Sequence, residues 1–143
     1  MANEEHLAML KQGVDSWNVW REEHPDILPE LSRTDLRGIT LSWVNLSRGD
    51  LSWSNLSETL LCFANFQGAK LSGALFTRTD LRKANFIRAD LSGASFNEAN
   101  LSEANLNEAN LRKAYFTAAD LSRVDLRGAN LNEAYFTGAD LEG

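Results

Sequence analysis

Cysteine and histidine are almost absent from this chain of 143 residues. Its single cysteine, Cys62, leaves no partner for an intrachain disulfide. One thiol and two histidines, His6 and His24, are too few for a zinc cluster. We therefore predict that the protein has no metal site and no cofactor.

Long hydrophobic runs are also missing. No stretch of about 18 apolar residues occurs, so we predict no transmembrane helix. The first ten residues, MANEEHLAML, contain two acids where a secretory signal needs positive charge and then an apolar segment. We expect a cytoplasmic protein.

A strong excess of one charge is missing from most of the chain. The net charge is −6, but residues 1–26 hold six acidic and two basic residues. Residues 27–143 hold fourteen acidic and twelve basic residues and are nearly neutral. The acidity is therefore concentrated near the N-terminus.

What the chain does contain is a five-residue period. Every position ending in 1 or 6, from Leu31 to Leu141, is Leu or Phe, which makes 23 positions without an exception. Two residues earlier, 14 of the 23 positions are Ala, and one residue earlier 15 are Asn or Asp. An α-helix turns by about 500° over five residues, so these side chains would spiral around all its sides. In a long strand the same spacing would change face at each step. A solenoid of short sides and corners keeps all of them inside.

The period of one complete coil is twenty residues. All six phenylalanines at core positions end in 6, and residues 110–121 match residues 130–141 at nine of twelve positions. Four sides per coil explain both observations and place the phenylalanines on two opposed walls. Residues twenty apart are then vertical neighbours. Gly recurs at some corners and charged residues at others, so we expect turns of mixed type.

The stretch ANLSEANLNEANLRKAYF, residues 99–116, resembles the pentapeptide-repeat family, in which A-(D/N)-L-x-x recurs in tandem. The resemblance covers residues 29–143 and implies an all-β solenoid, namely a right-handed quadrilateral parallel β-helix of about six coils. The family is abundant in cyanobacteria, and residues 1–28, which we interpret as a capping helix and linker, resemble cyanobacterial caps.

The ends of a solenoid need protection because they expose unpaired backbone and apolar core. Asn3 is a suitable N-cap for a helix over residues 4–23, which ends before Pro25. The apolar face that should cover the first coil consists of Leu7, Leu10, Val14, Trp17 and Trp20. A cap that detaches to bind a partner is the alternative. No cap follows Leu141, so the last coil is either frayed or in contact with a second molecule. In similar family members a dimer contact at this end usually includes an extra helix, which is missing here. We therefore favour a monomer and keep an end-to-end dimer through the C-terminal coil as the alternative.

The outward charged positions predict a neutralised surface. At twenty-residue spacing Arg78 lies between Glu58 and Glu98, Lys83 is followed by Glu103 and Arg123, Arg88 faces Glu108, and Lys113 faces Glu133. Some family members resemble DNA in charge and bind DNA gyrase, a role that needs an unbalanced acidic surface. That role is our alternative. Neither histidine lies in the repeats and no base accompanies the serines, so we predict no enzyme.

Exposed apolar residues provide the remaining signal. Trp43 and Phe63 are one coil apart on one wall, with Leu60 beside Phe63, whereas Trp53 lies on an opposed wall. Exposed aromatic clusters are candidate binding sites for a protein partner. The competing interpretation, which we favour for these two residues, is that the N-terminal segment or the linker of residues 24–30 folds back over Trp43 and Phe63. We predict a rigid protein-binding module that does not bind nucleic acid directly, and the partner's identity is open.

Overall fold

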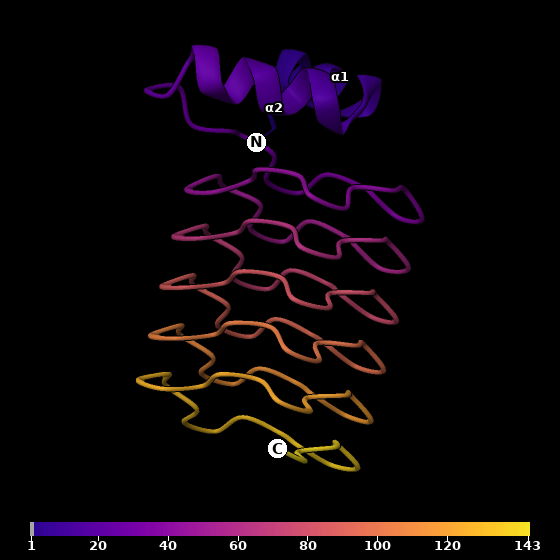
Figure 1. Ribbon diagram of the computed structural model, residues 1–143, viewed down its shortest axis with the longest axis vertical. Coiled ribbons are helices and arrows are strands. Elements are labelled where there is room, and N and C mark those ends of the chain that lie inside the picture. The colour runs from indigo at the N-terminus through magenta and orange to yellow at the C-terminus, as the bar shows by residue number, and fades with distance from the viewer. Residues whose placement is uncertain (1) are drawn as a thin grey trace.

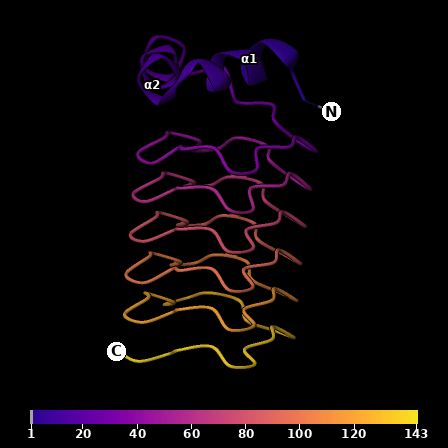
Figure 2. The same ribbon diagram turned by 90° about the vertical axis from the view of Figure 1, so that its right-hand side faces the viewer.

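The computed structural model describes residues 2–143 and shows a stack of coils with two helices at one end (Figure 1). The helices are α1 (Glu4–Gln12) and α2 (Val14–Glu23). The coils follow, and the two ends of the chain lie at opposite ends of the stack (Figure 2). Within the described residues, the coils contain isolated bridges rather than longer strands.

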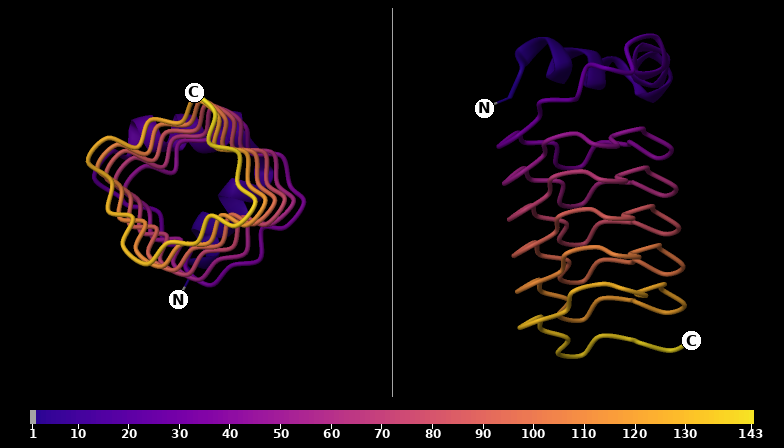
Figure 3. Two further views of the ribbon diagram at one scale, coloured as in Figure 1. Left: turned by 90° about the horizontal axis from the view of Figure 1, so that it is seen from below. Right: turned by 90° about the vertical axis from the view of Figure 1, so that its left-hand side faces the viewer.

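Parallel bridges join residues that are twenty positions apart. They run without a gap from Glu30↔Asp50 to Asp120↔Asp140 and recur every five residues, so each coil carries four of them. The coils superpose when the stack is viewed along its axis (Figure 3). In the backbone, the core residue Leu31 donates to the carbonyl of Asp50 at 2.7 Å, and Asp50 donates to that of Pro29 at 2.8 Å. The predicted twenty-residue coil is confirmed.

The core is a column of leucine side chains and phenylalanine rings. Phe66 stacks on Phe86 with centroids 4.9 Å apart, and Phe76 stacks on Phe96 at 5.0 Å. Phe66 meets Phe76 edge to face at 5.9 Å, because these two rings come from facing walls. All four are completely buried. The alanines are buried beside these rings, and Val44 and Thr79 occupy the same inward position in other units.

Every corner has a residue with positive φ. The positions ending in 3 or 8, from Arg33 to Gly138, all have a φ between 54° and 73°. At most corners, the amide of the next residue donates to the carbonyl three residues earlier, as that of Ala64 does to Leu61 at 3.1 Å. A positive φ at the third residue is the mark of a type II turn. Glycine and charged corners thus share a positive φ, because the stack imposes it even on Glu, Arg, Lys and Trp.

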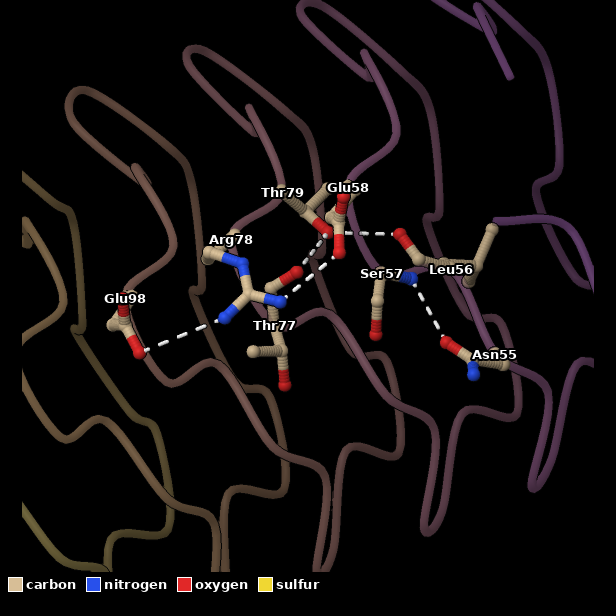
Figure 4. Close-up of polar contacts among 8 residues, drawn as sticks. All are labelled: Asn55, Leu56, Ser57, Glu58, Thr77, Arg78, Thr79 and Glu98. Atoms are coloured by element: carbon tan, nitrogen blue, oxygen red, sulfur yellow. Dashed lines mark hydrogen bonds and ion pairs between the residues drawn. The ribbon is translucent and has the colours of Figure 1, made fainter. Parts of the chain in front are cut away.

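Hydroxyl groups replace alanine at several inward positions without leaving a polar atom unpaired. Thr79 donates to the carbonyl of Leu56 at 2.8 Å (Figure 4), and Ser54 donates to that of Leu51 at 2.6 Å. Each of these buried hydroxyls is thus satisfied by the backbone.

The capping segment consists of two helices instead of the single helix we expected over residues 4–23. The break is at Gly13, whose φ of 130° is unfavourable for residues other than glycine. The predicted N-cap is confirmed, because the Asn3 side chain accepts from the amides of Glu5 and His6. The break lets both helices lie across the end of the stack (Figure 1).

Candidate functional site

The cap presents its apolar face to the first coil. Leu10 and Trp17 are fully buried, while Leu7, Val14 and Trp20 are partly buried and pack against the same core. Trp17 and Trp20 are also in ring contact, with centroids 5.1 Å apart. The five residues that sequence reasoning selected therefore all lie at the end of the stack.

Polar side chains of the cap pair with the open backbone edge of the first coil. Trp17 donates its Nε1–H to the carbonyl of Asn45 at 2.8 Å. Asn18 donates its amide to the carbonyl of Trp43 at 3.0 Å and accepts from the amide of Asn45 at 2.8 Å. One coil later the equivalent amide, that of Asn65, donates to the backbone of Val44. The cap therefore replaces the backbone partners that a preceding coil would supply.

Two further residues complete this edge, and sequence reasoning missed them. His6 Nδ1 accepts from the amide of Glu30 at 3.0 Å, and Arg21 Nη2 donates to the carbonyl of Ser47 at 3.0 Å. Both side chains are buried. Their signal was weak, because a search for apolar periodicity ignores polar residues on the same helix face.

The predicted charge columns are present along the corners. Arg78 lies between two carboxylates, 3.0 Å from Glu58 and 3.9 Å from Glu98 (Figure 4). Glu103 is 3.8 Å from Lys83 and 3.4 Å from Arg123. The remaining expected pairs, Arg88–Glu108 at 2.6 Å and Lys113–Glu133 at 3.8 Å, also form. Each glutamate at a corner position is thus paired with a basic side chain of a neighbouring coil.

A second kind of ion pair lies within a single side of a coil. Arg127 binds the carboxylate of Asp125 through two nitrogens, with a shortest distance of 2.6 Å, and this hydrogen bonding lowers the pKa of Asp125 to about 2. Arg37 lowers the pKa of Asp35 to about 2 in the same way. Residues two apart on a short extended side point to the same face, which explains these pairs.

Trp43 and Phe63 form an exposed aromatic stack at one corner. Their ring centroids are 4.2 Å apart and their planes differ by 3°. The side chains are 63% and 40% exposed, and Lys83 Nζ lies 5.4 Å from the Phe63 centroid. Leu60, three residues before Phe63, is 47% exposed. We call Trp43, Leu60 and Phe63 the aromatic patch.

The cap touches the edge of this patch without covering it. Asn18 bonds to the backbone carbonyl of Trp43, whose ring remains exposed. The interpretation in which the N-terminal segment folds back over Trp43 and Phe63 is therefore wrong. The reason is that α1 and α2 pack on the end of the stack and not along its wall.

Comparison with known families identifies the repeats. The family model for pentapeptide repeats matches eight copies, in residues 30–61, 63–97 and 94–132. The chain belongs to the pentapeptide repeat family. A search of curated protein sequences finds no match.

Several solved pentapeptide repeat structures are similar to this chain. One, from the thylakoid lumen of Arabidopsis thaliana, shares 38% identity over 73% of this chain and 70% of its own length, with a TM-score of 0.57. Rfr23 from the cyanobacterium Cyanothece 51142 shares 27% identity over 87% and 93%, with a TM-score of 0.40. QnrB1, a plasmid-mediated fluoroquinolone resistance protein, shares 23% over 79% and 77%, with a TM-score of 0.41.

The other predicted features of this pentapeptide repeat chain have clear positions. Cys62 is partly buried. Burial is the main cause that raises the pKa of its thiol, and the neighbouring Asp80 raises it further, so the reactive thiolate is disfavoured. Trp53 is 61% exposed at a different corner. Its ring lies over Gly73, where an added Cβ would come within 2.3 Å of the indole.

The described residues form neither a metal-binding cluster nor a membrane-spanning helix. In residues 2–143 no three His, Cys, Asp or Glu side chains are grouped so as to hold a metal ion. Over the same range, neither helix has the length and hydropathy needed to cross a bilayer. The C-terminal coil is less covered than the rest, since Leu126, Leu131 and Phe136 are only partly buried and Leu141 is exposed.

Proposed function

We propose that this pentapeptide repeat chain is a rigid, non-enzymatic protein-binding module whose partner docks on the aromatic patch. The observation that carries the proposal is the stack of Trp43 on Phe63, two large rings held parallel in solvent. Membership of the family supports a right-handed quadrilateral form for the coils.

A pre-ordered aromatic pair suits binding for an energetic reason. Aromatic residues dominate the binding energy of many interfaces, and rings that are already fixed lose little conformational entropy when a partner covers them. The coil backbone fixes both rings, because Trp43 donates its amide to the carbonyl of Cys62 at 3.0 Å and Phe63 donates to that of Arg82 at 2.9 Å. The patch is thus a rigid docking point on a rigid stack.

Partner capture from a native lysate tests this proposal. The double variant Trp43→Ser/Phe63→Ser should lose a protein that the parent chain retains. Trp53→Ser is the matched control, because Trp53 is equally exposed but lies at a different corner. Circular dichroism should show that all three proteins are folded. An identical set of captured proteins from the parent and the double variant would exclude the patch as the docking point.

A DNA mimic that acts on gyrase is the alternative, and the charge distribution disfavours it. DNA carries dense, uncompensated negative charge, whereas Glu58, Glu98, Glu103 and Glu108 all have a basic neighbour within 4 Å. We expect no inhibition of gyrase in a supercoiling assay at sub-micromolar protein. Inhibition there would replace the protein-binding proposal with the mimic.

The solution state and location are also part of the proposal. We propose a cytoplasmic monomer, with an end-to-end dimer through the C-terminal coil as the alternative. Sedimentation velocity tests the state, and Leu141→Ser is the informative variant because Leu141 is 57% exposed at that end. A dimer in the parent that is lost in this variant would decide for the alternative. Cell fractionation tests the location.

A further inference from the structure

Two arginines of one corner column, together with an arginine of the cap, leave positive charge without a full set of partners. The column contains Arg48, Gly68 and Arg88, each one coil from the next. Gly68 has no side chain, and Cγ of Arg48 lies 3.5 Å from the point where a Cβ on Gly68 would stand. Beside this contact is a hollow of about 310 Å³ that both arginines line. Its lining is Ser47, Arg48, Asn65, Gln67, Gly68 and Arg88.

Arg48 lies in the first coil and, like Arg33 at another corner of that coil, has no carboxylate partner among residues 2–143, unlike the corner arginines of later coils. Arg78, Arg88 and Arg123 each form an ion pair with a glutamate of a neighbouring coil. No ion pair of residues 2–143 includes Arg48. Glu30 and Asp50 share a neighbouring hollow with Arg48, yet neither is within ion-pair distance of it.

Arg88 faces the hollow with part of its guanidinium unused. Its Nε binds Glu108 at 2.6 Å, on the side away from Arg48. Its two Nη atoms make no hydrogen bond within the described part of the chain. A planar guanidinium can hold a second anion through those nitrogens.

A third positive charge lies behind Ser47. Arg21 is only 7% exposed, and its Nε and Nη1 are buried without a partner among residues 2–143. Nη2 binds the carbonyl of Ser47 at 3.0 Å and its hydroxyl at 3.4 Å. Burial, and to a smaller extent the positive charge of Arg48, lower the pKa of this guanidinium. A buried charge without a counter-charge is unfavourable, so an anion nearby would stabilise the docked cap.

We propose that the hollow beside Gly68 is a binding site for a phosphate-type oxyanion held between Arg48 and Arg88. The two arginines are two coils, or about 10 Å, apart along the stack, so their side chains can approach one anion from opposite sides. Asn65 and Gln67 add polar groups on the wall. Donors from several directions suit a tetrahedral phosphate, which offers more acceptor oxygens than a planar carboxylate.

Calorimetric titration of the full chain with inorganic phosphate, in a buffer of constant ionic strength set with chloride, tests the site. The variants are Arg48→Gln and Arg88→Gln, with Arg78→Gln as the control. Arg78 occupies the same position of the repeat and loses the same charge, but it is flanked by Glu58 and Glu98. We expect the parent and the control to bind phosphate with the same affinity. Both test variants should bind it at least about tenfold more weakly.

Thermal unfolding provides a second readout. Phosphate stabilises proteins non-specifically by exclusion from their surface, and this effect should be equal in all variants. A specific site adds a saturable increase in melting temperature for the parent and Arg78→Gln only. Arg48→Gln and Arg88→Gln are independent tests, so the failure of one to fold leaves the other informative. Equal responses in all four proteins, or no binding by the parent, would overturn the proposal.

Comparison of two probes identifies the source of the phosphate group. O-phosphoserine that binds more tightly than inorganic phosphate, with the same loss in both variants, assigns the site to phosphate esters. Tighter binding of inorganic phosphate assigns it to the free ion. Both results require Arg48 and Arg88.

Discussion

Replacement of Asn18 by alanine should weaken the contact between the cap and the first coil and lower the free energy of unfolding. The Asn18 side chain is a single amide that makes two hydrogen bonds with the first coil, one to the carbonyl of Trp43 and one from the amide of Asn45. In later coils the equivalent of the Asn45 amide is paired by the backbone of an adjacent coil, as the Asn65 amide is by the carbonyl of Val44. The variant removes both bonds without disturbing the apolar face of α2.

The expected loss follows from these contacts. Each bond contributes about 0.5–1.5 kcal/mol net, and an amide left unpaired in a partly buried place costs about 1–3 kcal/mol. Alanine returns roughly 0.6 kcal/mol because it favours the helix more than asparagine does. We therefore expect the free energy of unfolding to fall by about 1–2 kcal/mol.

Urea denaturation followed by far-UV circular dichroism measures this loss, and hydrogen exchange at the Asn45 amide measures it locally. Ser16→Ala is the matched control, because Ser16 is exposed on the same helix and gains a similar helix propensity. An Asn18→Ala protein as stable as Ser16→Ala, with unchanged exchange at Asn45, would refute the view that the cap replaces a coil.

Three further predictions concern the corners and the ion pairs. Gly93→Ala should destabilise the fold by about 1 kcal/mol, and Ala118→Gly should not. Both residues have a left-handed backbone, which costs a residue with a Cβ roughly 1–2 kcal/mol. Thermal unfolding checks the sign, and a stabilising Gly93→Ala would contradict it. The pKa of Asp125 is lowered to about 2, so its contribution to stability is present above its ordinary value near 3.8 and is lost as the pH falls through about 2. The free energy of unfolding between pH 5 and 2 should therefore fall less steeply in Arg127→Gln, and equal slopes would show that the pair does not matter. Arg78→Gln should leave stability within experimental error, since exposed ion pairs contribute little, and a large loss in denaturation would show cooperative charge columns.

The stack was predictable because its signal is strictly periodic. Twenty-three apolar positions at constant spacing exclude a helix and a long strand, and the match between residues 110–121 and 130–141 reports the length of a coil. Vertical pairs such as Arg78–Glu98 and Phe116–Phe136 then follow from arithmetic, and the structure contains both. The apolar side of the cap was predictable by the same reasoning, from spacing alone.

The corners and the polar side of the cap were not predictable in this way. The residue types at the corners vary widely, yet all adopt a positive φ because the coil closes only in that conformation. Asn18, His6 and Arg21 have no periodic signal, since their roles depend on backbone groups of residues 30–47 that only folding brings near.

The amino-acid sequence by itself therefore determined the coil, its core and the vertical order of its side chains, because a five-residue repeat has one way to bury its apolar residues. Only the tertiary structure decided which backbone groups the cap pairs with, that the aromatic patch stays exposed, and that Arg48 lines a hollow near the buried Arg21. These features depend on how two non-repeating helices meet the end of the stack, and no period in the chain encodes that contact.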